Sequence, residues 1–339
     1  MRRRSIPLVL SVLLSFAGGT SAFADTTSTT SPVTSTIKNP PRVVRTAPLT
    51  GLPDPTAVSK RRSALTIKVE NTPEARPQYG IEQADVIYEE IVEGGITRLA
   101  AIFNSRLPIK VGPVRSVRRT DREIVYPIGG LFAFSGGAQY AINSIATAPV
   151  KLFDESNSGS AMFRDPTRYA PHNLYADPVR LMSMGGVARP PRPLFQFAPV
   201  GTRALGAPVG SFTVNFPAGY ATSYQWNPAT KSWPRSIFGR PDVTASRVQM
   251  SPTNVIVMSV NYEGGVGRIG AEAVLTGSGS VDVFSDGRVQ KGKWFRSKLG
   301  LPTAYRTASG KVIELHPGQT LVELLATGET VSAYAPKHP

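Results

Sequence analysis

Two apolar runs that flank a pair of glycines constrain the fold of this chain more than any other feature. Residues 86–93 and 96–103 have the composition of half-buried strands, and Gly94-Gly95 between them is typical of a two-residue hairpin turn. Such a turn joins two antiparallel neighbours. The sequence therefore predicts a β-hairpin near the start of the folded region.

The register of this hairpin decides which charged side chains share a face. With a two-residue turn, Glu89 and Glu93 become the diagonal neighbours of Arg98 on one face. Glu90 then lies on the opposite face, among apolar neighbours, where a carboxyl group has a raised pKa and can act as a general acid or base. The alternative is a structural ion pair that holds the hairpin together.

Arginines after a Gly-Pro pair predict a basic helix face. Arg118, Arg119 and Arg122 follow Arg115 by three, four and seven residues, which is the spacing of one side of a helix. Arginine near a helix start is unfavourable unless an anion lies nearby, and backbone N–H groups there bind anions. Ser116 is placed to cap the helix or to donate to the anion. We expect an anion site here, with a solvated basic face as the alternative.

A second corner between a strand and a helix carries small polar residues. Ser135, Gly136 and Gly137 follow the expected strand 131–134 and precede an expected helix over 138–146. The two glycines allow backbone amides to approach a ligand closely. We expect a ligand-binding loop at this corner.

The polar and proline-containing loop 164–175 supplies the remaining candidates. His172 is the one histidine of the first predicted domain, so it is the residue there best suited to transfer protons near neutral pH. Arg168 and Asn173 in the same loop are candidate ligand-binding residues. Glu90 and His172 are the two candidate catalytic residues, although a lone histidine also has a purely structural interpretation.

A proline-rich break over residues 189–193 divides the folded part into two predicted domains. Residues 48–188 mix strand and helix patterns, which indicates an α+β or α/β domain with a mixed sheet. Residues 194–335 contain mainly short strands bounded by Gly, Pro, Asn and Asp, and indicate a mainly β domain.

The amino terminus has the pattern of a secretory signal peptide over residues 1–24. Three arginines precede the apolar stretch 6–17, and small residues before Asp25 predict cleavage after Ala24. The stretch is too short to span a membrane, and no other window reaches its length. The Thr/Ser/Pro-rich residues 25–47 predict a linker. We therefore expect a secreted or wall-associated protein with no transmembrane segment in its mature chain.

Composition excludes several kinds of site. The chain has no cysteine, which excludes disulfides, thiolate metal ligands and a cysteine nucleophile. Its three histidines are scattered, so no metal site is predicted, and no cofactor is indicated. The formal net charge of +15 favours anionic surroundings, but the chain lacks a basic stripe interleaved with aromatics, so nucleic acid is not the expected partner.

Six short blocks, in order along the chain, carry a family resemblance. They are Lys68-Val-Glu-Asn, Ala84-Asp-Val-Ile-Tyr-Glu-Glu, Glu93-Gly-Gly-Ile-Thr-Arg, Val111-Gly-Pro-Val-Arg-Ser, Phe134-Ser-Gly-Gly and Pro171-His-Asn-Leu-Tyr. Together they resemble the YerB-like lipoproteins, bacterial cell-envelope proteins built on a domain of unknown function, DUF3048. The resemblance covers about residues 48–335 and implies an exported two-domain protein, with no activity to carry over. The chain departs from the lipoprotein pattern because it has no lipobox cysteine.

Two functions remain open from the sequence. The first is an envelope protein that binds an anionic wall component or an envelope protein through an arginine-rich pocket. The second is an enzyme that acts on a phosphorylated or glycan cell-wall substrate, with Glu90 or His172 as the proton-transfer group and the arginines stabilising developing charge.

Overall fold

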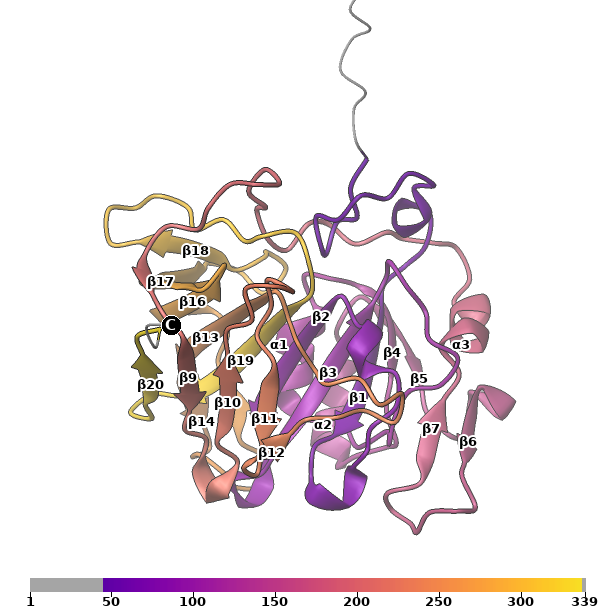
Figure 1. The fold of residues 1–339 in the computed structure, drawn as a ribbon. Coiled ribbons are helices and arrows are strands. Elements are labelled where there is room, and N and C mark those ends of the chain that lie inside the picture. Colours follow the sequence, from indigo (N-terminus) through magenta and orange to yellow (C-terminus); the bar gives the residue numbers. More distant parts are fainter. Residues whose placement is uncertain (1–44, 337–339) are drawn as a thin grey trace, which may run out of the picture. The chain divides into compact units, whose positions relative to one another are not determined.

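The computed structural model describes residues 45–336. The predicted signal peptide, and the predicted linker up to residue 44, lie outside the described residues. Figure 1 shows a broad twisted sheet with α1 and α2 on one side and a smaller sheet in front of it. Within the described part, no helix has the length and apolar character that a membrane crossing requires.

Eleven strands form the large sheet. Five come from the first half of the chain: β1 (Leu65–Glu70), β2 (Val86–Ile91), β3 (Thr97–Phe103), β4 (Gly130–Ala133) and β5 (Val150–Phe153). The other six are β8 (Ala207–Pro208), β13 (Asn254–Val260), β16 (Gly277–Ser285), β17 (Arg288–Arg296), β18 (Ala304–Thr307) and β19 (Thr320–Ala326). Their order is β18-β17-β16-β13-β19-β2-β3-β1-β4-β5, with β8 paired to β17.

The large sheet is mixed. β3 is antiparallel to both β1 and β2, whereas β4 is parallel to β1 and β19 is parallel to β2. The β2–β19 pairing joins the two halves of the chain edge to edge in one sheet. The carboxyl ends of β1, β2, β4 and β19 consequently meet at one edge, which is where ligands bind in many α/β folds.

A five-stranded antiparallel sheet comes entirely from the second half of the chain. It has the order β12-β11-β10-β9-β20, with bounds β9 (Ser211–Val214), β10 (Thr222–Gln225), β11 (Arg235–Ile237), β12 (Arg240–Pro241) and β20 (Val331–Tyr334). Two small antiparallel pairs complete the strands: β6 (Met162–Arg164) with β7 (Leu174–Ala176), and β14 (Tyr262–Glu263) with β15 (Glu272–Ala273).

Helices are few and short. The α-helices are α1 (Arg119–Val125), α2 (Gln139–Ile145) and α3 (Pro178–Met184), and the short 3-10 helices are η1 (Val58–Lys60), η2 (Pro73–Ala75), η3 (Ile81–Gln83), η4 (Glu93–Gly95), η5 (Gly159–Ala161) and η6 (Pro217–Gly219). The fold-class prediction is confirmed: the amino-terminal part has a mixed sheet with a few helices, and the carboxyl-terminal part consists mainly of strands.

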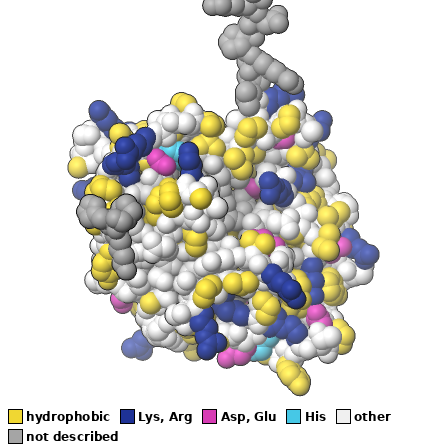
Figure 2. Space-filling model, viewed as in Figure 1, with side chains coloured by type: hydrophobic (Ala, Val, Ile, Leu, Met, Phe, Trp, Pro, Cys, Tyr) yellow, Lys and Arg dark blue, Asp and Glu magenta, His cyan; other side chains and the backbone are white. Residues whose placement is uncertain are grey.

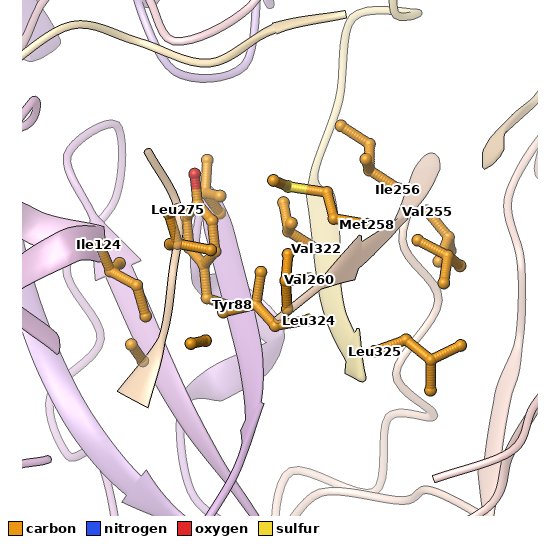
Figure 3. Packing of buried hydrophobic residues seen from close by; sticks show 14 of the residues in the cluster. Tyr88, Ile124, Val255, Ile256, Met258, Val260, Leu275, Val322, Leu324 and Leu325 are labelled. Atoms are coloured by element: carbon orange, nitrogen blue, oxygen red, sulfur yellow. The ribbon is translucent and has the colours of Figure 1, made fainter. Parts of the chain in front are cut away.

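Apolar side chains cover both faces of the large sheet, since alternate strand residues point to opposite faces. Figure 3 shows Tyr88, Val322 and Leu324 packed with Ile124 of α1 and Leu275. On the opposite face, the odd-numbered residues of β1, namely Leu65, Ile67 and Val69, are fully buried. Burying an aliphatic side chain of this size contributes roughly 1.5–3 kcal/mol.

The predicted register of the first hairpin is wrong by one residue. Glu90 pairs with Arg98, and Ile91 pairs with Thr97. The turn is longer than two residues, because Val92 N donates to Ile96 O at 2.8 Å and three residues lie between them. A one-residue shift moves every side chain of the strand to the other face. Glu90 therefore shares a face with Arg98, and Glu89 does not.

The predicted basic helix begins later than expected. Residues 115–118 lie outside any helix, Arg118 has an extended backbone, and α1 starts only at Arg119. The side chain of Asp121 accepts from Arg118 N at 2.7 Å and so already occupies the helix start. Ser116 does not cap this helix, and Arg115 does not share a helical face with Arg122.

Candidate functional site

The segment 113–117 extends the large sheet at its carboxyl edge. Arg115 N donates to Lys68 O at 2.9 Å, and Glu70 N donates to Pro113 O at 3.0 Å. On the other side of the segment, Ser135 N donates to Arg115 O at 3.0 Å. The segment thus lies between the end of β1 and the Ser-Gly-Gly corner that follows β4.

Glycine is needed at the contact between this corner and the segment. Val117 N donates to Gly136 O at 3.0 Å. A Cβ atom on Gly137 would lie 2.8 Å from Cγ1 of Val117, closer than real contacts allow. Gly137, one of the two glycines predicted to approach a ligand, therefore allows the corner to pack closely against Val117.

The His172 loop reaches the same place through β7. Val114 N donates to Leu174 O at 2.7 Å, and Val111 N donates to Ala176 O at 2.9 Å. These bonds fix β7 beside the segment that carries Arg115. Residues about 60 positions apart in the sequence, Arg115 and His172, consequently become neighbours.

Three arginines gather at this edge, and we refer to Arg98, Arg115 and Arg118 as the arginine cluster. Figure 2 shows Lys and Arg side chains collected over the lower part of one face, with acidic and histidine side chains among them. The three members differ in how their charge is balanced by the rest of the protein.

Arg118 is neutralised by a neighbour from the hairpin turn. Its Nε and Nη2 atoms donate to Oε2 of Glu93 at 2.9 and 2.7 Å. Burial acts to raise the pKa of Glu93, but the hydrogen bonds and charge of Arg118 outweigh burial and lower it. Glu93 and Arg118, both predicted site residues, therefore form an ion pair.

Arg98 has no such partner. Its side chain is 7% exposed, and Nη1 donates to Ser116 O at 3.1 Å. Among residues 45–336, no carboxylate oxygen lies within 4.0 Å of its guanidinium nitrogens. Burial, followed by the positive charges of Arg118 and Arg115, lowers the pKa of Arg98 to about 10. Arg98 is thus a nearly buried cation crowded by like charges.

Arg115 lies against a carboxylate that the sequence analysis did not select. Its Nε atom is 3.3 Å from Oε1 of Glu70, and His172 Nδ1 is 2.9 Å from Oε2 of the same residue. The Glu70 side chain is 1% exposed, whereas those of Arg115 and His172 are 20% and 25% exposed. One buried carboxylate therefore links the arginine cluster to the histidine.

Glu90, the other predicted catalytic residue, is enclosed beneath the arginine cluster. Its carboxylate pairs with Lys68 Nζ, which also lies 2.8 Å from Oδ1 of Asp121, and all three side chains are fully buried. Burial raises the pKa of Glu90, although the charge of Lys68 opposes the shift. Glu90 has no exposed surface through which it would reach a substrate.

Glu89 lies on the opposite face of the sheet, as the corrected register requires. Its Oε1 accepts from Asn71 Nδ2 at 2.9 Å and from Thr97 Oγ1 at 2.7 Å, and its Oε2 accepts from Arg235 Nη2 at 2.6 Å. Arg235 is buried and also pairs with Asp242. Glu89 therefore belongs to a polar network between the two sheets and not to the arginine cluster.

The other predicted ligand-binding residues have protein partners. Arg119 Nη2 lies 2.7 Å from Oε2 of Glu272. Arg168 donates to the backbone oxygens of Glu74 and Ala75 at 2.6 and 3.2 Å and so holds the turn after β1. Asn173 Oδ1 accepts from Arg164 at 2.9 Å. Of the predicted residues, the structure brings together Arg98, Arg115, Arg118, Glu93, Ser116, His172 and the 135–137 corner.

The five best-defined surface cavities in the described residues lie away from this edge. The largest of five surface cavities has a volume of about 600 Å³ and is lined by Leu52, Arg203, Lys231 and His316, and none of the five is lined by Arg98 or Arg115. No group of three or more potential metal-ligating side chains occurs within residues 45–336. The candidate site is therefore defined by the charged side chains of the arginine cluster.

Lys68 and Glu70 are functional candidates that the sequence reasoning missed. They occupy alternate positions of β1, with fully buried apolar residues between them. The available signal was the alternation of Thr66, Lys68 and Glu70 with apolar residues, because polar residues at every second position of a strand share one face.

Two family models match this chain. The DUF3048 N-terminal domain, described as a protein of unknown function, matches residues 49–187, and the DUF3048 C-terminal domain matches residues 212–322. The Bacillus subtilis (strain 168) protein YerB, which is named as a lipoprotein, is 39% identical over 132 residues, covering 38% of this chain and 39% of that relative. The crystal structure of Bacillus subtilis YerB superposes with a TM-score of 0.72 at 22% identity, over 85% of this chain and 99% of that one. This likeness shows a shared fold.

Proposed function

We propose that this chain, which belongs to the DUF3048 family of unknown function, binds a small anion through Arg98 and Arg115. The ligand carries a phosphate or carboxylate group. It is a cell-envelope component or the exposed part of an envelope partner.

The state of Arg98 is the observation that carries this proposal. Burial and the like charges of Arg118 and Arg115 make its cationic form unfavourable, and the more distant charges of Glu93 and Glu90 offset that cost only in part, since neither forms an ion pair with it in the described part of the chain. An anion bound beside Arg98 and Arg115 would supply the missing charge, and guanidinium groups bind phosphate or carboxylate oxygens bidentately. Arg118 contributes less, because Glu93 already balances its charge.

An envelope location fits this ligand class. The sequence of residues 1–24 has the pattern of an export signal, and the YerB relative is named as a lipoprotein. Anionic polymers and lipids are abundant outside the membrane, and the net charge of +15 favours association with them. We propose secretion or wall association rather than a lipid anchor, since the chain has no cysteine to carry one.

The enzyme alternative depends on one of its two candidate groups. Glu90 is fully buried and paired with Lys68, so it is not in a position to meet a substrate. His172 lies at the arginine cluster and retains partial exposure. This second function is therefore tied to His172 and its carboxylate partner.

Calorimetric titration with inorganic phosphate tests the binding proposal. We expect saturable binding that weakens as salt rises, because the charges are partly exposed to solvent. Arg98→Gln should weaken binding at least tenfold, in line with the loss of a charged hydrogen bond worth about 1.5–3 kcal/mol. Arg192→Gln, at an exposed arginine outside the cluster, removes the same charge and is the matched control.

Two results would contradict the proposal. One is equal phosphate affinity in wild type and Arg98→Gln. The other is equal weakening by Arg98→Gln and Arg192→Gln, which would make the effect one of net charge rather than of a site.

A further inference from the structure

We propose that Glu70 and His172 form an acid–base pair that hydrolyses a phosphate ester held at Arg98 and Arg115. This inference rests on the proposed anion binding and adds a reaction to it. The substrate class is an alkyl or glycosyl ester of phosphate, and the co-reactant is water.

The contact with Glu70 fixes which nitrogen of the His172 imidazole carries a proton. His172 Nδ1 lies 2.9 Å from Oε2 of Glu70, and an ionised carboxylate only accepts hydrogen bonds. Nδ1 therefore carries a hydrogen, so in the neutral form of the ring the lone pair is at Nε2. No protein group in residues 45–336 pairs with Nε2. A carboxylate that fixes the tautomer of a histidine in this way is a recurring arrangement in general-base catalysis.

The carboxylate of Glu70 is itself held in a fixed position. Glu70 Oε1 lies 3.3 Å from Arg115 Nε and accepts from Thr72 Oγ1 at 3.1 Å. Its backbone N donates to Pro113 O at 3.0 Å. With its side chain 1% exposed, Glu70 is held on both sides and in turn holds the ring of His172.

Contacts at both ends hold the loop that carries His172. Lys110 Nζ lies 2.9 Å from Oδ2 of Asp165 and within 4.1 Å of the ring centres of Tyr79 and Tyr175. Arg168 donates to the Tyr175 hydroxyl at 2.8 Å. These contacts fix both ends of the loop, so the imidazole is positioned before any ligand binds.

The anion site at Arg115 lies close to the proposed base, His172. Arg115 Nη1 donates to Pro171 O, the residue before His172, at 3.4 Å, and Arg115 shares Glu70 with His172. A phosphate group bound to Arg115 consequently lies next to the imidazole.

The proposed reaction balances with water alone. His172 Nε2 removes a proton from water as the water oxygen bonds to phosphorus, and the bond from phosphorus to the ester oxygen breaks. The departing alkoxide takes a proton from solvent water on the opposite side of phosphorus and leaves as an alcohol, the imidazolium releases its proton to solvent, and phosphate remains. Arg98 and Arg115 stabilise the negative charge on the non-bridging oxygens during the transfer.

Turnover of p-nitrophenyl phosphate and bis(p-nitrophenyl) phosphate by the full-length protein tests the proposal. We expect His172→Gln to lower kcat at least 100-fold, the usual contribution of a general base, while the Kd for inorganic phosphate stays within twofold. Glu70→Gln should lower kcat less, because the imidazole remains but its tautomer is no longer fixed. His316→Gln, at the other described histidine, should keep full turnover.

Chemical rescue separates catalysis from a structural role. Added imidazole should restore part of the turnover of His172→Gly, since the free ring can enter the vacated space. A residue that only supports the loop would instead change phosphate binding and thermal stability together, without rescue, and that result would overturn the proposal.

The two proposals fail in distinguishable ways. If wild type binds phosphate but hydrolyses neither probe above the buffer rate, the acid–base pair is wrong and anion binding stands. If wild type does not bind phosphate at all, both fail.

Discussion

Glu90 and Arg98 are directly paired across β2 and β3, yet the carboxylate of Glu90 forms its ion pair with Lys68 and leaves Arg98 without an acidic partner. This pairing divides the polar side chains on one face of the large sheet into two groups. The inner part is the buried group Lys68, Glu90 and Asp121, which is balanced within itself. The outer part is the arginine cluster, which has an excess of positive charge. We expect the inner part to support the fold and the outer part to bind ligand.

Removing Lys68 should destabilise the protein strongly. Lys68→Met leaves the carboxylates of Glu90 and Asp121 buried together without a cation, and losing one partner of a buried pair costs about 3–5 kcal/mol. The double variant Lys68→Met/Glu90→Gln should recover much of this loss. The free energy of unfolding from urea denaturation measures both, with Lys293→Met on the exposed face of β17 as control. A Lys68→Met loss below about 1 kcal/mol would mean that the group is not held as an ionic unit.

Removing the charge of Arg98 should stabilise the folded protein rather than destabilise it. The pKa of Arg98 is lowered from 12.5 to about 10, which corresponds to a cost of about 3 kcal/mol for its cationic form in the folded protein. Arg98→Met keeps the apolar stem and removes that charge. We expect its melting temperature in phosphate-free buffer to equal or exceed that of wild type, measured by calorimetry.

Phosphate should reverse this ranking. A ligand that binds only the folded state raises its stability in proportion to RT ln(1 + [L]/Kd). Wild type should therefore melt higher as phosphate increases, while Arg98→Met should not respond. A parallel rise in both proteins would show that phosphate acts without Arg98.

Glu323 should make stability fall as pH rises. It is fully buried, and burial together with the nearby charge of Glu89 raises its pKa well above the ordinary value of 4.5. The folded state thus keeps a proton that the unfolded chain releases above about pH 4.5, so the free energy of unfolding decreases with pH in that range. Glu323→Gln removes this contribution to the pH dependence of the free energy of unfolding.

The advantage of Glu323→Gln over wild type should therefore grow between pH 5 and pH 8, by at most about 1.4 kcal/mol per pH unit. Urea denaturation across this range measures the difference. Glu329→Gln, at an exposed position beyond β19, should show no such trend. A constant difference between Glu323→Gln and wild type would contradict a shifted Glu323.

Two adjacent glycines offer a test of the corner beside Arg115. A Cβ on Gly137 would meet Val117 Cγ1 at 2.8 Å, whereas a Cβ on Gly136 would meet nothing within 4 Å. Gly137→Ala should push back the strand that carries Arg115 and weaken phosphate binding severalfold. Gly136→Ala adds backbone strain without a clash, so it should lower the melting temperature and leave binding nearly unchanged. Equal phosphate affinity in the two variants would show that the corner does not position Arg115.

The hairpin shows how far local sequence information reached. Residues 86–91 and 97–103 are strands, as their composition indicated, because alternating and β-branched side chains favour extended backbone. The register failed because Gly94 and Gly95 fit more than one turn length, and both adopt positive φ in the longer turn that forms. The longer turn also makes contacts with distant residues: Gly94 N donates to Gly267 O at 2.9 Å.

The candidate site shows the same limit from another direction. Arg98, Arg115 and His172 could be selected from residue type and local pattern. The alternation in β1 could have drawn attention to Glu70, but its role could not be predicted from it, because that role depends on a contact with His172, 102 positions away. The basic helix was misplaced because Arg115 N bonds to Lys68 O, and this sheet pairing outweighs the helix preference of the segment.

By itself, the sequence determined the strand-rich composition, the mixed fold class, the family resemblance and a concentration of arginine near residue 115. These follow from local side-chain chemistry, which is present before folding. Only the tertiary structure decided that Glu90 is buried with Lys68, that Arg98 is left with like charges, and that Glu70 joins Arg115 to His172. The reason is that pairing of charges depends on register and on contacts between distant strands, which the packing of both faces of the sheet selects.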